Sequence, residues 1–599
     1  MVVGIYVIRS SERSEVEAKR GGREVKSFSS FPSARHSAIL RVPKTHMSRK
    51  ERPMNVNDAI ARILKQEGVE WATCFPSNNL IEAVAKEGIR PVAFRHERGA
   101  GMAADGYGRL NDRQKFAVFI MQQQAGAENS MGALNQANAD NVPVLYLPGG
   151  PATDRMSIRP EFWATRMYQN MCKQAETIFK ADQVSAVMRR AFHALRNGRP
   201  GPVVVEIPSD IANQEVPEAA LAYKSPSTMR QVPCKNDIQD AVKALLRAKR
   251  PVIWAGMGVL LANASKELTE LAELLEVGVY TSMPGKSAMD ERHPLALGAG
   301  SSSTTLTAKT WLQSADALFA VGSSLTSTHY GQHIPAGKFI IHNTISQEDI
   351  NKDQSADIGL AGDARETLRV MIEEVKAQIG PQGRKGKTTV PAEIAQIKAK
   401  WYEEWMPLLT DDSEPINPYR VIWEIDRNLD KERSIVTHDA GAPRDEMVPF
   451  FTATVPHSYI GWGKSTHLGY GIPLMIGAKM AYPDRFCLNF MGDAAFGMSG
   501  LDIETSARAG LPITTVLSNN GIMATYPANV YPTAQDKYGV TRMQGDYAKI
   551  AEGMGAVGIK VTKPAEIAPA LKRAQRLNAE GKTVLLDIRT RREEKRSGK

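Results

Sequence analysis

Apolar and polar residues alternate along the chain in a pattern that predicts helices interleaved with short buried strands. From residue 57 apolar positions recur three and four residues apart, which predicts an amphipathic helix. Apolar runs at 71–75 and 91–94 predict two strands with a second helix between them, and a Gly/Ala-rich helix follows from about residue 97. This alternation is typical of α/β proteins with parallel sheets.

Two stretches interrupt the alternation and divide the chain into three units. Residues 212–235 are rich in Pro, Ser and Ala, and residues 380–389 are rich in Gly and Lys, so both predict linkers. The expected fold is α/β, with three doubly wound parallel-sheet domains. The predicted bounds are 1–53 for a disordered basic extension, 54–211, 236–378 and 415–590 for the three domains, and 591–599 for a charged tail.

The net charge of +10 comes from the two ends of the chain. Residues 1–53 contain twelve Lys and Arg against five Asp and Glu, and residues 589–599 contain six against two. The rest of the chain is therefore almost neutral. A nucleic-acid-binding face needs basic residues clustered on a folded surface, so the charge pattern argues against a nucleic-acid partner.

Cysteine usage and hydropathy indicate a soluble protein of a reducing compartment, which predicts a cytoplasmic location. The four cysteines lie far apart and form no CxxC pair, which argues against disulfides and a cysteine metal site. No apolar run approaches the length of a membrane span, so no membrane partner is expected. Residues 1–53 contain several acids, which disfavours a targeting peptide but leaves that alternative open.

The most informative stretch for function is a predicted strand–helix–strand unit. It consists of an apolar run at 486–491, a helix at about 499–508 that Gly510 and Pro512 end, and a second apolar run at 513–517. A right-handed crossover between the two strands sets them parallel. The carboxyl ends of both strands therefore meet at one edge of a sheet, where ligands bind.

Oxygen-bearing residues stand at both of these strand ends. Gly492-Asp493 follows the first strand and Asn519-Asn520 the second. Carboxylate and amide oxygens suit Mg²⁺, which commonly shares its coordination shell with phosphates. Small residues beside Asp493 and the start of the next helix would accept a diphosphate. The alternative is an ordinary β-turn-α unit without a ligand.

The spacing of these two pairs resembles the signature of thiamine-diphosphate (ThDP) enzymes, and the whole chain resembles the acetolactate synthase/2-oxo acid decarboxylase superfamily. The resemblance implies three domains, which bind the pyrimidine, form a central Rossmann-like unit, and bind the diphosphate. It implies that Asp493, Asn520 and the main-chain carbonyl of Ile522 hold Mg²⁺. Gly492 belongs to the same cofactor turn.

Two turns that the resemblance assigns to the diphosphate depart from the family pattern. Ala494 and Ala495 stand where the family has Gly and a hydroxyl residue. Gly441 opens the second turn as in the family, but Ala442 and Pro443 replace polar residues. A side-chain hydrogen bond to the diphosphate is therefore expected to be missing, while backbone donors remain.

Three further residues are assigned to the cofactor rings by resemblance alone. The segment RHERGAGMAADGYGR is similar to the family run in which Glu97 hydrogen-bonds N1′ of the aminopyrimidine and acts as the catalytic residue. In the loop GWGKSTHLGYG, the carbonyl of Thr466 would accept from the 4′-amino group. Leu468 would wedge between the two rings. Without the resemblance, the position of Glu97 at a helix N-terminus indicates a helix cap, and Leu468 is expected to pack in the core.

The predicted activity is ThDP- and Mg²⁺-dependent cleavage or formation of a C–C bond next to a carbonyl, by a decarboxylase or carboligase acting on a small 2-oxo acid. The loop 124–129 keeps only Gly-Ala and the final Asn of the family element, and Gly150 replaces a Gln of acetolactate synthases. A 2-hydroxyacyl-CoA or diketone lyase is therefore an alternative. A non-catalytic paralogue is a third hypothesis, which retention of Glu97 disfavours.

The remaining expectations concern partners and a second ligand. The resemblance implies a homodimer or homotetramer with active sites at the subunit interface. In the central domain Gly256 and Gly258 weakly suggest FAD or ADP, but Asn343 stands where relatives have Asp, which favours a structural role. The charged tail favours a solvated end over a lid or an anion-binding segment.

Overall fold

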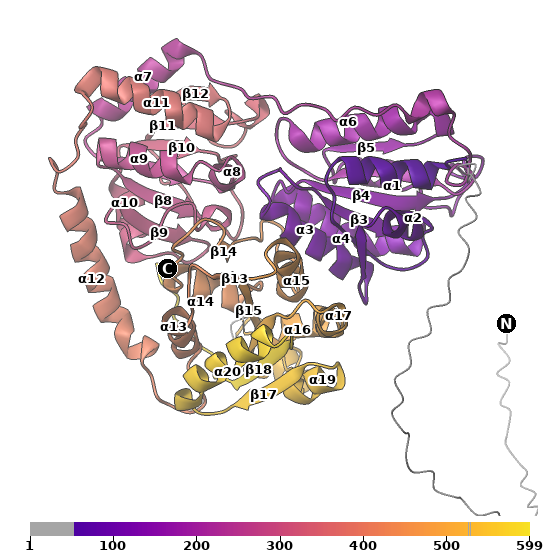
Figure 1. The fold of residues 1–599 in the computed structure, drawn as a ribbon. Coiled ribbons are helices and arrows are strands. Elements are labelled where there is room, and N and C mark those ends of the chain that lie inside the picture. Colours follow the sequence, from indigo (N-terminus) through magenta and orange to yellow (C-terminus); the bar gives the residue numbers. More distant parts are fainter. Residues whose placement is uncertain (1–52, 525, 527–528, 599) are drawn as a thin grey trace, which may run out of the picture. The chain divides into compact units, whose positions relative to one another are not determined.

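Three sheets of six strands each form the framework of the protein, and every strand pairing within them is parallel (Figure 1). The structure is a computed structural model that describes residues 53–524, 526 and 529–598. The predicted α/β fold with three parallel sheets is confirmed. The predicted disordered extension lies outside the described residues, apart from Pro53.

The first sheet has the strand order β2-β1-β3-β4-β6-β5. Its strands are β1 (Trp71–Cys74), β2 (Arg90–Ala93), β3 (Ala117–Met121), β4 (Val144–Gly150), β5 (Gln174–Thr177) and β6 (Val203–Pro208). Its helices are α1 (Val56–Gln66), α2 (Leu80–Lys86), α3 (Glu97–Arg109), α4 (Ala125–Ala139), α5 (Ala164–Tyr168) and α6 (Val184–Arg196). Helices cover both faces, so β3 and β6 are buried along their whole length and read as continuous apolar runs.

The second sheet has the strand order β12-β11-β10-β7-β8-β9. Its strands are β7 (Pro251–Ala255), β8 (Gly278–Ser282), β9 (Ala296–Gly300), β10 (Ala317–Val321), β11 (Phe339–Thr344) and β12 (Ile358–Ala361). The helices of this region are α7 (Lys235–Arg247), α8 (Met257–Leu261), α9 (Ser265–Leu275), α10 (Leu306–Ser314), α11 (Ala364–Ile379) and α12 (Val390–Leu409). The strand order reverses between β7 and β10, which makes that edge the switch point of the sheet.

The third sheet has the strand order β14-β13-β15-β16-β18-β17. Its strands are β13 (Ser434–His438), β14 (Tyr459–Ile460), β15 (Phe486–Gly492), β16 (Thr514–Asn519), β17 (Val557–Val561) and β18 (Val584–Arg589). Its helices are α13 (Pro418–Asn428), α14 (Ala442–Phe450), α15 (Gly471–Ala481), α16 (Asp493–Ser499), α17 (Asp502–Ala509), α18 (Pro532–Tyr538), α19 (Tyr547–Gly553) and α20 (Ile567–Ala579).

Short 3-10 helices connect several of these elements. They are η1 (Ala181–Gln183), η2 (Glu218–Leu221), η3 (Met283–Gly285), η4 (Gln347–Asp349) and η5 (Pro564–Glu566). Among the described helices, none combines the length and the apolar character that crossing a bilayer requires.

The helix predicted at about 499–508 corresponds to α17, which begins at Asp502, and a further short helix, α16, was not predicted. α16 begins directly at the end of β15, and Gly500 separates it from α17. Gly500 lies against the Phe496 ring, where an added Cβ would come within 2.4 Å of a ring carbon. Gly510 ends α17 in a left-handed conformation, as the sequence predicts. The additional helix matters because it makes Asp493 the first helical residue after the strand.

The first and third sheets share one buried core in which α3 and α15 pack together. Glycine permits this close approach at two positions. A Cβ on Gly106 would lie 2.3 Å from the carbonyl oxygen of Leu474, and a Cβ on Gly477 would lie 2.0 Å from that of Ala103. No side chain fits at either glycine, so the two helices touch through their backbones.

The interpretation of the C-terminal tail as a solvated end holds for Glu594 and Lys595, which are exposed, but is wrong for Ser597. Ser597 is only 1% exposed, and its hydroxyl donates to the carbonyl of Thr304 at 2.7 Å. The Trp401 indole donates to the same hydroxyl at 2.8 Å, and the Tyr419 hydroxyl donates to the carbonyl of Lys595 at 2.7 Å. Charge alone favoured solvent, but the Ser597 hydroxyl and the main-chain carbonyl of Lys595 form hydrogen bonds with distant segments of the chain.

Candidate functional site

Asp493 and Asn520 follow neighbouring strands of the third sheet, as the crossover argument predicts. β15 and β16 pair side by side, with Gly492 opposite Ser518. The Asp493 carboxylate accepts a hydrogen bond from the backbone N–H of Gly521 at 2.7 Å and from that of Ala494 at 2.8 Å. The turn after β16 is therefore tied directly to the first residue of α16.

A single cavity at these strand ends is lined by all but one of the residues that the sequence nominated. The nominated residues on its lining are Gly441, Thr466, Leu468, Gly492, Asp493, Ala494, Ala495, Asn520 and Ile522. They come from the turn after β13, the loop before α15, the turn after β15 and the turn after β16. Segments as far apart in sequence as Gly441 and Ile522 thus meet at one end of the sheet.

Burial governs the electrostatics of Asp493, which is 3% exposed. Removal from water raises the pKa of its carboxyl, while the N–H groups of Gly521 and Ala494 and the nearby charge of Arg589 lower it. A carboxylate in this position is held in one orientation by two backbone donors. Its remaining lone pairs are available to a cation.

The loop that carries Thr466 and Leu468 is anchored by a residue that the sequence reasoning missed. The Asp439 carboxylate, just after β13, accepts from the backbone N–H groups of Gly469 at 3.0 Å and Gly471 at 2.8 Å. Burial raises the pKa of Asp439 to about 6, against the lowering effect of these donors. The available signal was an Asp directly before Ala-Gly at a strand end.

Glu97 is the one nominated residue that does not line this cavity in its own chain. Glu97 is the first residue of α3 and is 4% exposed. The side chain of His96 caps the N-terminus of this helix. The Asn129 amide donates to the Glu97 carboxylate at 3.1 Å. Asn129 is the final residue of the loop 124–129, where the sequence keeps the Asn of the family element. The cavity that Asp493 lines therefore does not include Glu97 of the same chain.

Charged and aromatic residues complete the cavity lining, and the sequence reasoning did not select them as site residues. Arg444 and Glu446 belong to α14, Tyr330 comes from the connection between β10 and β11, and Tyr526 follows β16. Burial raises the pKa of Glu446 to about 7, while Arg596 of the tail, 3.3 Å from its carboxylate, lowers it. A run of Arg, Asp and Glu in a helix usually indicates a solvent-exposed face. Nothing in the sequence therefore indicated that Arg444 and Glu446 line a cavity.

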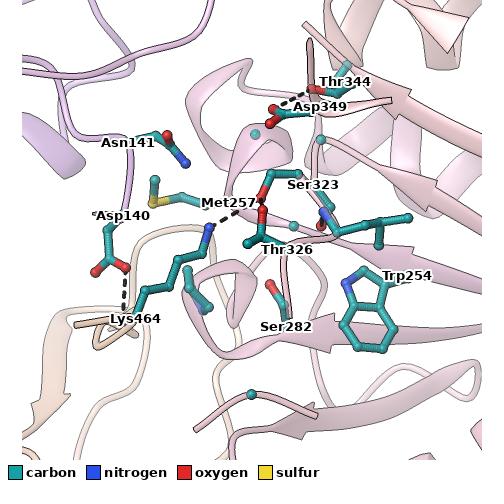
Figure 2. A pocket seen from close by; sticks show the side chains of 18 of the residues that line it. Asp140, Asn141, Trp254, Met257, Ser282, Ser323, Thr326, Thr344, Asp349 and Lys464 are labelled. Atoms are coloured by element: carbon teal, nitrogen blue, oxygen red, sulfur yellow. Dashed lines mark hydrogen bonds between the residues drawn. The ribbon is translucent and has the colours of Figure 1, made fainter. Parts of the chain in front are cut away.

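A second cavity lies at the switch point of the central sheet (Figure 2). Its lining includes Trp254 and Met257 near the end of β7 and Ser323 near the end of β10. Lys464 reaches it from the third domain: its ammonium donates to the Ser324 hydroxyl at 3.3 Å, and its backbone N–H donates to Asp140 at 3.2 Å. All three sheets therefore contribute to the wall of this cavity.

Asn343, which the sequence reasoning weighed against a nucleotide, does not line the second cavity. It is fully buried inside β11, and its amide donates to the carbonyls of Leu360 at 3.0 Å and Gly362 at 3.1 Å. Its side chain cross-links the strand to its neighbour. The identity of this residue is therefore explained by packing within the sheet.

Within the described residues, no group of three or more His, Cys, Asp and Glu side chains is placed to hold a metal ion. A cation at Asp493 would consequently depend on amide and main-chain oxygens and on oxygens of the ligand itself. This arrangement suits Mg²⁺, because the ion is usually bound by only one or two protein carboxylates and commonly coordinates phosphates.

Comparison with protein families matches each of the three sheets to one family model. Residues 54–177 match the N-terminal TPP binding domain of thiamine pyrophosphate enzymes. Residues 238–371 match the central domain of these enzymes, and residues 439–588 match their C-terminal TPP binding domain. The fold and the cavity thus define a ThDP-dependent enzyme.

Curated relatives cover nearly the whole chain. The probable acetolactate synthase large subunit of Methanocaldococcus jannaschii is 30% identical over 554 residues, which are 89% of this chain and 91% of that protein. The acetolactate synthase large subunit of Corynebacterium glutamicum is 29% identical over 516 residues, 82% of this chain and 79% of that protein. The glyoxylate carboligase of Escherichia coli O157:H7 is 28% identical over 556 residues, 88% of this chain and 91% of that protein.

The chain therefore belongs to the acetolactate synthase-like thiamine pyrophosphate enzymes. The resemblance stated from the sequence is confirmed. So is the expected reaction class, the ThDP-dependent formation or cleavage of a carbon–carbon bond. None of these relatives favours the CoA-ester, diketone or non-catalytic alternatives.

Proposed function

We propose that this protein is a Mg²⁺-dependent decarboxylase or carboligase that acts on a small 2-oxo acid with ThDP bound at the end of the third sheet. The observation that carries the proposal is the shared cavity, in which Asp493 and the Asn520-Gly521 turn are joined by a 2.7 Å hydrogen bond. We further propose a cytoplasmic location, in keeping with the four cysteines, none of which forms a disulfide in the described part of the chain.

The residues of the cavity fit a metal-bound diphosphate. Asp493, the side-chain oxygen of Asn520 and the main-chain carbonyl of Ile522 supply hard oxygen donors for Mg²⁺. Gly441 has φ of 85°, which a residue with a Cβ rarely adopts, and it caps α14 at the cavity wall. A glycine there lets a diphosphate approach the backbone. When bound, ThDP supplies the electron sink for the bond that is made or broken.

The roles of the other nominated residues follow from the same assignment. The main-chain carbonyl of Thr466 would accept a hydrogen bond from the 4′-amino group, and Leu468 would pack between the two rings. Glu97 holds a proton at N1′ of the aminopyrimidine. Because Glu97 does not line the cavity of its own chain, we propose that a second copy of the chain supplies it. The active unit is then a homodimer, or two such dimers in a homotetramer.

A panel of 2-oxo acids tests the proposed function. With ThDP and Mg²⁺, purified protein should release CO₂ from, or join, at least one 2-oxo acid. Treatment with EDTA should remove the activity and added Mg²⁺ should restore it, because the metal bridges protein and diphosphate. Mass spectrometry of the products distinguishes decarboxylation from ligation. 2-Hydroxyacyl-CoA esters and cyclic diketones serve as comparison substrates, and turnover of those alone would contradict the proposal.

A nucleotide in the second cavity is a separate proposal, because a switch-point crevice is where such sheets bind ligands. Protein denatured directly after purification should release FAD or an adenine nucleotide in about one equivalent per chain. Absorbance at flavin wavelengths and chromatography of the supernatant measure both. A colourless protein that releases no nucleotide would leave the central domain with a structural role only.

A further inference from the structure

Arg444 differs from the other residues that line the ThDP cavity in being cationic. Among the lining residues that the structure describes, it is the one Lys or Arg. The two turns assigned to the diphosphate otherwise present small apolar side chains. These are Ala442, Pro443, Ala494 and Ala495. An anion in this cavity thus meets a single positively charged side chain.

The position of the Arg444 side chain is fixed by two contacts. Its guanidinium carbon lies 4.5 Å from the centre of the Tyr330 ring, within the range of a cation–π interaction. Its Nε donates to the Asp445 carboxylate at 2.9 Å. Asp445 is held in turn by the hydroxyls of Ser301 at 3.2 Å and Ser302 at 2.6 Å. The guanidinium therefore cannot swing freely towards solvent.

One donor group of this fixed guanidinium is left unused. Arg444 is 2% exposed, and its Nη1 is fully buried without a hydrogen-bond partner in the protein. A buried charged donor without a partner carries a desolvation cost, so it calls for an explanation. Its place on the cavity wall gives one, because a bound oxyanion would supply the missing acceptor.

We propose that Arg444 binds the diphosphate of ThDP, an inference that rests on the proposed function. In this role Arg444 would take the place of the polar side chains that the family has at positions 442, 443 and 495 and that this chain lacks. Arg444 is the third residue of α14, directly after the turn at Gly441, and that turn faces Gly492-Asp493 across the same cavity. A guanidinium presents paired N–H groups that match phosphate oxygens.

The test measures binding rather than turnover. Calorimetry on full-length, cofactor-free protein gives Kd for ThDP and for inorganic pyrophosphate, each with Mg²⁺. Arg444→Gln should raise both Kd values by about 10- to 100-fold, the range expected for loss of one charged hydrogen bond. Arg444→Lys keeps the charge but loses the paired donors, so its Kd should rise about 3- to 10-fold.

Arg485→Gln is a matched control. Arg485 also stacks on a tyrosine, with its guanidinium carbon 4.6 Å from the Tyr482 ring centre, and its Nη1 is also buried without a partner. It does not line the cavity. Arg485→Gln removes a comparable Arg–Tyr pair away from the cavity, so it should leave the Kd values for ThDP and pyrophosphate unchanged.

Three results would overturn the proposal in different ways. Unchanged Kd values in folded Arg444→Gln, or in Arg444→Lys if the first variant does not fold, would remove Arg444 from the diphosphate site. A raised KM for the 2-oxo acid with unchanged ThDP affinity would assign Arg444 to the substrate carboxylate instead. Wild-type protein that binds neither ThDP nor pyrophosphate would remove the proposed function itself.

Discussion

The Glu97→Gln variant should lose about 100- to 10,000-fold in kcat, the contribution expected of a positioned proton-transfer group. Gln has nearly the same shape as Glu, and Asn129 can still hydrogen-bond its side-chain oxygen. The amide, however, cannot hold and release a proton at N1′. ThDP should therefore bind with Kd changed less than a few-fold while turnover collapses. Steady-state kinetics and calorimetry on the same preparation measure the two effects.

Mixing two inactive variants tests where Glu97 acts. If each site combines Glu97 of one chain with Asp493 of another, a mixed dimer of Glu97→Gln and Asp493→Ala has one intact site and one doubly altered site. Random reassembly makes half of the dimers mixed, so about a quarter of the wild-type activity should return. If both residues served the same chain's site, reassembly would restore nothing.

The Asp493→Ala variant should bind ThDP at least about 100-fold more weakly in the presence of Mg²⁺, since outer-shell changes alone typically cost 10- to 100-fold in metal affinity. The variant removes the only carboxylate among the three proposed ligands. It also leaves the N–H of Gly521 without its acceptor, which should lower the free energy of unfolding by about 1–3 kcal/mol.

Two measurements separate these effects. Titration of cofactor-free protein with ThDP at fixed Mg²⁺ reports the loss of the metal ligand, and thermal unfolding without cofactor reports the lost hydrogen bond. Asp493→Asn keeps one oxygen acceptor for Gly521, so it should unfold near the wild-type temperature but still bind ThDP weakly. Full ThDP affinity in either variant would show that the metal is held elsewhere.

The strands and the turns that carry Asp493 and Asn520 could be predicted from short-range sequence patterns and the order of the elements. Buried parallel strands read as apolar runs, so β15 and β16 were found within a few residues of their observed bounds. Asp493 and Asn520 were brought together by the crossover rule, which needs only the order of elements. The short helix α16 was missed because its seven residues include Gly497 and are followed by Gly500, and glycines disfavour a helix.

Residues whose environment is made by distant segments could not be predicted. Arg444 and Glu446 are buried because Tyr330 and the tail residue Arg596 pack against them from remote parts of the chain. The sequence shows only three charged residues in a helix. The interpretation of Asn343 shows the opposite problem. The sequence analysis considered this residue as a sign of ligand binding, but its side chain joins two strands.

The backbone contact between α3 and α15 has a consequence for how ligands enter. Glycines at 106 and 477 leave no space for sliding, so the first and third sheets should move as one rigid body. Entry to the cavity then requires no hinge between them. Gating falls to the Tyr330 connection, which reaches the cavity from the central sheet, and hydrogen exchange should find its fastest opening there.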